Sequence, residues 1–316
     1  MTKRKPTILI VGGPTASGKT SAAVEAALLL NGEIVGADSM QIYKRLSIGT
    51  AKPDTAEMKG VPHHMIDIVE PSVSYDVARY REQAALCIDG ILSRGRLPII
   101  CGGTGLYIAS LIYGMDLGGA PPDEDLRASL LDVLKKDGKE KLHLMLKQAD
   151  AKAAERIHEN DTRRVMRAIE AAGQGGNIKK GFRSKPGRYN YVFTALNMDR
   201  MLLYDRINAR VDKMIERGLI GEVEGLLREG IAAESTALGF IGYKEITAHL
   251  LSGVPLIESI EAMKRNTRRY AKRQLTWLNR ENCVWIDAGG VNAKAMAAKI
   301  AQIFRNNIIE GDSNGC

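Results

Sequence analysis

Residues 7–20 read Thr-Ile-Leu-Ile-Val-Gly-Gly-Pro-Thr-Ala-Ser-Gly-Lys-Thr, and this order of residue types decides the fold. The apolar run at 8–11 predicts a buried strand, and the alanine- and leucine-rich run at 22–30 predicts a helix. The stretch between them has the spacing of a phosphate-binding loop, a glycine followed by four residues and then Gly-Lys-Thr. It comprises Gly13, Pro14, Thr15, Ala16, Ser17, Gly18, Lys19 and Thr20.

A loop of this kind binds anions through three contributions. Its backbone N–H groups wrap the anion, the helix N-terminus adds partial positive charge, and the side chain of Lys19 neutralises phosphate oxygens. Thr20 would offer its hydroxyl to a magnesium ion. The motif does not identify the phosphate compound, of which a nucleoside triphosphate such as ATP is the commonest.

Strand-like and helix-like segments alternate through residue 115, which is typical of a parallel sheet covered on both faces. The expected strands are 7–13, 33–37 and 97–102, and the expected helices are 18–31, 76–94 and 105–113. The fold class is therefore α/β, with a phosphate-loop NTPase-like core whose parallel sheet is flanked by helices. Since ligands bind at the carboxyl edge of such a sheet, the phosphate loop, residues 38–41 and residues 102–105 should share one crevice.

The domain organisation is read from changes in composition. Residues 1–116 form the first part of the core, 117–190 a small all-helical insertion domain that ends in a basic loop at 173–189, and 191–316 the second part of the core. The second part should contain a strand at 191–196, helices at 201–228, 243–251 and 256–280, a strand at 283–286 and a helix to about residue 306. The polar tail at 310–316 is expected to be disordered.

Composition narrows the class of protein. No run of this 316-residue chain approaches the roughly 20 apolar residues that span a membrane. The first apolar run is broken by Gly12, Gly13 and Pro14, so it does not resemble a signal peptide, and a cytoplasmic protein is expected. The cysteines have no paired metal-ligand spacing, which argues against a zinc site and a disulfide framework. They are Cys87, Cys101, Cys283 and Cys316.

Polar residues follow two of the predicted strands. Asp38 suits a base that takes a proton from a nucleophile, or a magnesium ligand, although a helix N-cap is the alternative. Ser39, Gln41 and Tyr43 could read the edge of a base, and Thr104 could donate its hydroxyl to a phosphate oxygen. The strand at 97–102 ends in two glycines where an ATPase often carries Asp, so phosphoryl transfer is disfavoured.

His63 and His64 are adjacent, so on a strand they would point to opposite faces. This disfavours a metal pair. We expect one of them to form a hydrogen bond and the other to lie at the surface.

The net charge of +8 is concentrated in one stretch. Residues 262–280 contain seven basic side chains and no acidic one, and six of them form two rows at i, i+4 spacing. An opposed stripe of Ile257, Ile260, Thr267, Ala271, Leu275 and Leu278 would face the core. Like charges this dense favour a polyanionic partner. The rows are Lys264, Arg268 and Lys272, and Arg265, Arg269 and Arg273.

Two further basic patches indicate a large folded nucleic acid. One lies on the helical insertion and contains Asp161, Arg163, Arg164 and Arg167. The other lies in the loop after it and contains Lys179, Lys180, Arg183, Lys185 and Arg188.

With these motifs in place, the chain resembles the bacterial tRNA dimethylallyltransferases, also called tRNA isopentenyltransferases. The resemblance extends from residue 13 to 277 and is carried by eight blocks in the family's order. They are the phosphate loop 13–20, Ala-Asp-Ser-Met-Gln-Ile-Tyr (37–43), Ile-Gly-Thr-Ala-Lys-Pro (48–53), Val-Pro-His-His-Met-Ile-Asp (61–67), Gly-Gly-Thr-Gly-Leu-Tyr (102–107), Asn-Asp-Thr-Arg-Arg-Val (160–165), Ile-Gly-Tyr-Lys-Glu (241–245) and Thr-Arg-Arg-Tyr-Ala-Lys-Arg-Gln-Leu-Thr-Trp (267–277).

The resemblance implies magnesium-assisted transfer of a dimethylallyl group from dimethylallyl diphosphate to N6 of adenine 37, in tRNAs that read codons beginning with U. Asp38 would be the general base, while Lys19, Thr20 and Thr104 would stabilise the diphosphate, with Arg206 and Arg210 as further anion contacts. The anticodon stem-loop would be contacted by Asp38, Ser39, Met40, Gln41, Thr104, Asp161, Arg163 and Arg164 and by the basic helix. The chain is expected to be a monomer.

Three other functions stay open from the sequence. A phosphate-loop kinase would require ATP turnover and leave the basic helix unexplained. An adenylate isopentenyltransferase acting on free nucleotides would need neither the insertion nor the basic patches. A non-catalytic RNA-binding module would not need Lys19, Thr20, Asp38 and Thr104 together.

Overall fold

The computed structural model describes residues 5–115, 123–174 and 187–313, with the side chains of 310–313 left out. The chain divides into two compact units. Unit 1 combines residues 1–112 with 187–316, and unit 2 contains 113–186. Unit 1 therefore consists of two segments separated by the insertion.

Unit 1 is built on a parallel sheet of six strands in the order β3-β2-β4-β1-β5-β6. Its strands are β1 (Thr7–Gly12), β2 (Gly32–Ala37), β3 (His63–His64), β4 (Leu97–Gly102), β5 (Asn190–Asn197) and β6 (Val284–Asp287). The phosphate-loop strand β1 lies between β4 and β5, with Leu9 paired to Ile99 on one side and to Val192 on the other. All the long strands that the sequence predicts are present.

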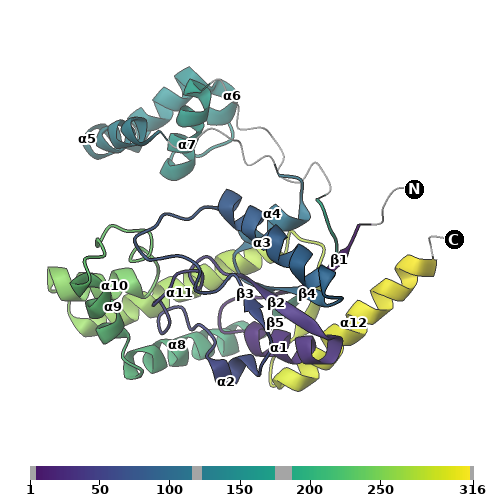
Figure 1. The fold of residues 1–316 in the computed structure, drawn as a ribbon. Helices are drawn as coiled ribbons and strands as arrows, with labels where there is room; N and C mark the ends of the chain where they lie inside the picture. Colours follow the sequence, from purple (N-terminus) through teal and green to yellow (C-terminus); the bar gives the residue numbers. More distant parts are fainter. Residues whose placement is uncertain (1–4, 116–122, 175–186, 314–316) are drawn as a thin grey trace. The chain divides into compact units, whose positions relative to one another are not determined.

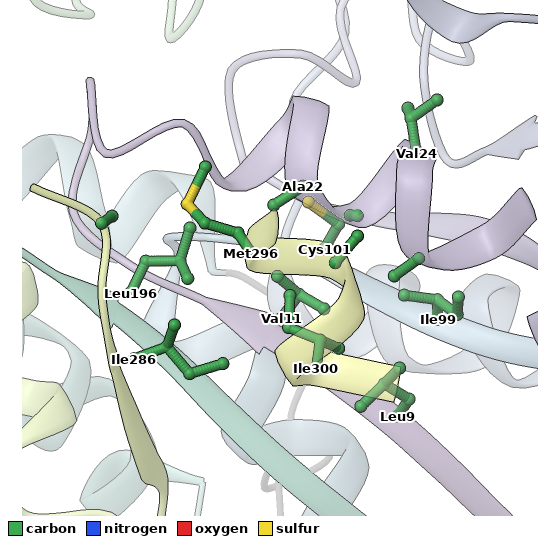
Figure 2. Packing of buried hydrophobic residues seen from close by; sticks show 14 of the residues in the cluster. Leu9, Val11, Ala22, Val24, Ile99, Cys101, Leu196, Ile286, Met296 and Ile300 are labelled. Carbon is green, nitrogen blue, oxygen red and sulfur yellow. The ribbon is translucent and has the colours of Figure 1, made fainter. Parts of the chain in front are cut away.

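Helices cover both faces of this sheet (Figure 1). On one face α1 (Lys19–Leu30) packs against α12 (Ala293–Ser313), and on the other α3 (Val77–Ser93) packs against α4 (Gly105–Ile112). Figure 2 shows the core beneath α1 and α12, where alternate strand residues such as Leu9, Val11 and Ile99 meet Ile300 of α12. This two-sided burial explains why β1 reads as a continuous apolar run rather than an alternating one.

The remaining helices of unit 1 differ from the prediction in their breaks. The single helix expected at 201–228 is two helices, α8 (Arg200–Glu216) and α9 (Leu219–Arg228), because Gly218 adopts a left-handed conformation between them. A short α2 (Thr55–Met58) precedes β3. After α9 come α10 (Tyr243–Ser252) and the basic helix α11 (Leu256–Leu278).

The named elements of unit 2 are all helices, and the unit has a core of its own. It contains α5 (Glu124–Ala149), interrupted by a non-helical Gly138, followed by α6 (Ala151–Ala154) and α7 (Thr162–Gly173). Its buried residues are Leu130, Leu142, Leu146, Ala153, Ile157, Val165, Ala168 and Ile169. The expected start of the insertion, residues 117–122, and most of the basic loop at 173–189 lie outside the described residues.

One prediction about the tail is wrong, because α12 continues to Ser313 where disorder was expected from residue 310. None of the described helices has the length and apolar character that crossing a membrane requires.

Candidate active site

The crevice lies where two neighbouring strands send their helices to opposite faces of the sheet. β1 continues through the phosphate loop into α1 on one face, and β4 continues through residues 102–104 into α4 on the other. Loops that diverge in this way leave a gap at the carboxyl edge of the sheet, which is the usual ligand position in open α/β folds. The phosphate loop and Thr104 are therefore neighbours, although 83 residues separate Thr20 from Thr104 in the sequence.

The phosphate loop has the backbone conformation of a tight turn that leads into a helix N-terminus. Ala16 and Gly18 have positive φ values of 64° and 86°, a conformation that glycine adopts without strain. Helix α1 starts at Lys19. The first N–H groups of any helix lack intrahelical partners, and here the N-cap residue Gly18 has no side chain to bond to them. The buried Ser17 hydroxyl is likewise without a partner among the described residues. These groups form the donor set that a phosphate needs.

Three charged side chains converge beside this loop. Burial lowers the pKa of Lys19, and the charge of Asp38 opposes that shift while Arg210 of α8 adds to it. Burial also lowers the pKa of Arg210, again opposed by Asp38. Asp38 thus lies within electrostatic range of both cations. Arg206 lies one turn before Arg210 on α8, and its role stays a prediction.

The segment after β2 holds Asp38 in a fixed orientation. Its Oδ1 accepts N–H hydrogen bonds from Met40 at 2.9 Å and from Gln41 at 3.4 Å. The backbone N–H of Ser39 donates to Oγ1 of Thr104 at 3.0 Å, and the Thr104 hydroxyl lies 3.3 Å from Oγ of Ser39. The structure therefore brings together Asp38 and Thr104, the two residues expected to be catalytic.

Gln41 has a role in holding its own loop. Its side-chain Nε2 donates to the carbonyls of Thr50 and Ala51, each at 3.2 Å. A contact with a nucleotide base would therefore use its Oε1 or require these bonds to break.

The two histidines after Pro62 do not behave as expected, because both make hydrogen bonds. His63 Nδ1 lies 2.8 Å from the carbonyl of Val61, and His64 Nε2 lies 2.7 Å from Oε2 of the buried Glu33. The described residues contain no cluster of three or more metal-ligating side chains.

Sequence reasoning missed two residues that reach the crevice from α11. Gln274 accepts a hydrogen bond from the backbone N–H of Thr15 at 2.8 Å and donates one to the carbonyl of Gly103 at 3.0 Å. Tyr270, one turn earlier, lies near Thr104 and Gln274, and burial raises its pKa to about 12. A polar residue at i+4 from a tyrosine and i−4 from the buried Leu278 was a signal that could have marked this face.

The basic helix is not uniformly exposed. Arg265, Arg269, Lys272 and Arg273 are exposed. Lys264 is ion-paired with Asp212 at 2.8 Å and with Glu261 at 3.3 Å, and Arg268 donates to Asn208 at 2.6 Å. The expected apolar stripe is wrong at Ile257, whose side chain is 67% exposed. The residues of α11 that are buried are Ser259, Met263, Ala271, Gln274 and Leu278.

In unit 2, the predicted patch lies at the start of α7. Asp161 is the N-cap, its Oδ1 accepting from the N–H of Arg164 at 3.4 Å, while Arg163 and Arg164 are exposed. Arg167 is bound to Glu170 at 2.5 Å. In the third patch only Arg188 is among the described residues, and it pairs with Asp89 at 2.8 Å.

The strand order, the loop and the charges around it define a phosphate-loop α/β protein with a carboxylate beside its anion cradle. Comparison with known families gives a match to the family described as IPP transferase over residues 41–281. The chain belongs to this family.

Similar proteins cover nearly the whole chain. A protein of Acetivibrio thermocellus named tRNA dimethylallyltransferase is 49% identical over 285 residues, which is 89% of this chain and 91% of that protein. One of the same name from Carboxydothermus hydrogenoformans is 46% identical over 299 residues, 93% of this chain and 96% of that protein.

Solved structures agree. The full-length tRNA isopentenylpyrophosphate transferase of Bacillus halodurans is 42% identical with a TM-score of 0.74, and the match covers 98% of this chain and 99% of that one. A eukaryotic dimethylallyltransferase acting on tRNA is 27% identical with a TM-score of 0.79, over 97% of this chain and 80% of that one.

Proposed function

We propose that this protein transfers a dimethylallyl group from dimethylallyl diphosphate to N6 of adenine 37 of tRNAs that read codons beginning with U. The observation that carries the proposal is the joining of Asp38 and Thr104 across the Ser39 amide, directly beside the phosphate loop. A carboxylate and an anion cradle in one crevice suit a reaction in which a nitrogen loses a proton while a diphosphate leaves. Family membership supports the same reaction.

The proposed reaction forms one bond and breaks one. N6 of adenine attacks C1 of the dimethylallyl group, the C1–oxygen bond breaks, and diphosphate departs with the bonding electrons. Asp38 accepts the N6 proton, since its Oδ1 is already oriented by two backbone amides. The hydroxyl of Thr104 lies beside it.

The leaving diphosphate would be stabilised by fixed positive groups. The first amides of α1, Lys19 and Arg210 supply them, and the hydroxyl of Thr20 adds a neutral hydrogen-bond donor. Burial disfavours the charged forms of Lys19 and Arg210, so a bound anion would stabilise both cations. These groups are already in place, so they stabilise the negative charge that develops on the leaving diphosphate without reorganising.

Magnesium fits this crevice only together with the substrate. The described residues hold no cluster of three or more acidic or other ligating side chains, but magnesium is commonly held by one or two protein oxygens and by substrate phosphates. Thr20 in the first turn of α1 provides such an oxygen. The ion would neutralise charge on the diphosphate.

RNA would bind across the exposed basic side chains. Arg265, Arg269, Lys272 and Arg273 of α11 provide phosphate contacts in unit 1, and Arg163 and Arg164 of α7 provide them in unit 2. Adenine 37 must leave the anticodon-loop stack to reach the sheet edge, where Ser39, Met40 and Gln41 would meet it. We propose that a single copy of the chain performs the reaction.

A single assay tests the proposal. The protein and magnesium are incubated with labelled dimethylallyl diphosphate and an unmodified anticodon stem-loop, in parallel with the same RNA carrying guanine at position 37, with AMP and with ATP. We expect label only in the first RNA. Label in AMP would favour the adenylate isopentenyltransferase, ATP turnover would favour the kinase, and no label with folded protein would refute the transfer.

A further inference from the structure

The buried side of α11 carries a polar side chain that joins the two loops of the crevice. Gln274 is 5% exposed, and both ends of its carboxamide are hydrogen-bonded: Oε1 accepts from Thr15 N, and Nε2 donates to Gly103 O. The two hydrogen bonds span 259 and 171 residues of sequence. A buried amide on a mostly apolar helix face costs free energy unless both of its ends are paired.

The fit between Gln274 and the loop after β4 is close. A Cβ added at Gly103 would lie 2.1 Å from Nε2 of Gln274, so no other amino acid fits there without displacing the carboxamide. Tyr270 of the same helix lies near Thr104. The buried face of α11 therefore reaches both loops: Gln274 bonds to Thr15 and Gly103, and Tyr270 lies near Thr104.

The bond to Thr15 also redefines the anion cradle. In a phosphate loop the backbone N–H groups are the anion donors, but the N–H of Thr15 points to Gln274. The donors that remain are later in the loop and at the start of α1, where Gly18 is the N-cap. Thr15 was predicted to bind diphosphate, and this stays a prediction for its side chain, while its backbone amide is bonded to Gln274.

We propose that Gln274 is a positioning residue, a clamp that fixes the separation of the phosphate loop from the Gly103–Thr104 segment so that both contact one diphosphate. This rests on the proposed function. Gln274 touches neither substrate in this role and acts through the two backbone groups that it holds. Preorganised donors stabilise a leaving anion without rearrangement, so loosening the clamp weakens both binding and turnover.

The test measures binding of inorganic diphosphate by titration calorimetry and the kinetics of prenyl transfer in the full-length protein. Gln274→Met keeps the length of the side chain and removes both hydrogen bonds. Gly103→Ala disrupts the same link from the loop side, because the added methyl group displaces the carboxamide while residue 274 itself stays glutamine. Asn266→Ala is the matched control, because Asn266 lies on α11 and donates to Glu245 at 2.8 Å, a carboxylate that caps α10.

We expect Gln274→Met and Gly103→Ala each to weaken diphosphate affinity roughly tenfold, with a lower kcat and a higher KM for dimethylallyl diphosphate. Affinity for the anticodon stem-loop should change less than about twofold. The double variant should lose little more than either single one, because the two substitutions remove one shared contact. Asn266→Ala should lower the melting temperature and leave diphosphate affinity unchanged.

Unchanged diphosphate affinity in both folded variants would overturn the clamp, as would strict additivity in the double variant. If Gln274→Met does not fold, diphosphate binding by Gly103→Ala tests the clamp, with a melting curve to show that this variant is folded. If the wild-type protein binds diphosphate in a Gln274-dependent way but prenylates no RNA, the clamp stands and the proposed transfer fails.

Discussion

Asp38 combines two tasks in one carboxylate, and its substitutions can separate them. Its Oδ1 holds the turn at Met40 and Gln41, and the proposed reaction also needs it as a proton acceptor. Asp38→Asn retains an oxygen for the two amides and is a far weaker base. Asp38→Ala removes both functions.

We expect Asp38→Asn to lower kcat by about 10²–10⁴-fold while RNA affinity stays within about threefold, because proton transfer contributes on that scale. Single-turnover kinetics with saturating substrates and an anisotropy titration of the stem-loop provide the two measurements. An equal loss of RNA affinity and turnover in the Asn variant would mean that Asp38 mainly shapes the site.

Glu170 shows how a single buried carboxylate supports unit 2. Burial by itself raises its pKa, but the N–H of Asp123 and the guanidinium groups of Arg167 and Arg127 together hold the pKa below its usual value. A depressed folded-state pKa means that the carboxylate stabilises the fold above its unfolded pKa and that this stability is lost as pH falls through the folded value.

Glu170→Gln should destabilise unit 2 at neutral pH by about 1–3 kcal/mol, since it weakens a buried charge-assisted network. As the pH falls below about 4, the stability of unit 2 in the wild-type protein should approach that in the variant. Hydrogen exchange of α5 and α7 amides between neutral and acidic pH measures both effects. A pH-independent difference would contradict the ionic origin.

Residues on adjacent strand ends could be predicted from the sequence because a parallel sheet brings its carboxyl ends together. Asp38 and Thr104 follow this rule, and the structure joins them. Gln274 and Tyr270 could not be placed in the same way, because their partners lie on a different element at a distance that no local pattern specifies. The roles assigned to the RNA-contacting residues stay predictions.

At the scale of elements, α11 has two faces with different tasks. Periodicity correctly predicted a long basic helix but placed Ile257 in the apolar stripe, where it is exposed. Ion pairing of Lys264 with Asp212 of α8 removes one of the six charges from the free set. The part of the basic face that remains for RNA is centred on Arg269 and Lys272.

Charge reversal at these positions should therefore act on RNA binding alone. We expect Arg269→Glu with Lys272→Glu to weaken stem-loop affinity at least tenfold and to reduce the slope of log affinity against log salt by more than one. Lys299→Glu on α12, an exposed lysine of the same unit, is the control. An unchanged salt slope in the double variant would exclude α11 as the phosphate-contacting helix.

Breaks within helices were harder to predict than their existence. Gly218 ends α8 because its left-handed backbone cannot continue the helix, yet a lone glycine in an amphipathic pattern is often tolerated. In the opposite direction, α12 extends past residue 310 although the sequence there is polar. Both errors concern ends, where the hydrophobic pattern carries the least information.

For the whole molecule, ligand binding and folding should be linked in unit 1 alone. Both tryptophans, Trp277 and Trp285, lie in unit 1, so their fluorescence reports its unfolding. Diphosphate at about 100 times its dissociation constant should stabilise that transition by about 2.7 kcal/mol. Exchange of α5 and α7 amides should not change.

Lys19→Ala is the control for that experiment, because it removes the cation of the loop and should abolish the shift. A shift that persists in this variant would place the diphosphate elsewhere. Slower exchange across both units would mean that the two are energetically coupled.

The interrupted course of unit 1 has a consequence for synthesis of the chain on the ribosome. β1 pairs with β4, made before the insertion, and with β5, made after it. The helices of unit 2 emerge while β1 still lacks its β5 partner, and their core needs no residue from the sheet. Domains commonly fold as units during translation. Unit 2 can therefore form first, and the nascent sheet waits with an open edge at β1 until residue 197 has left the exit tunnel.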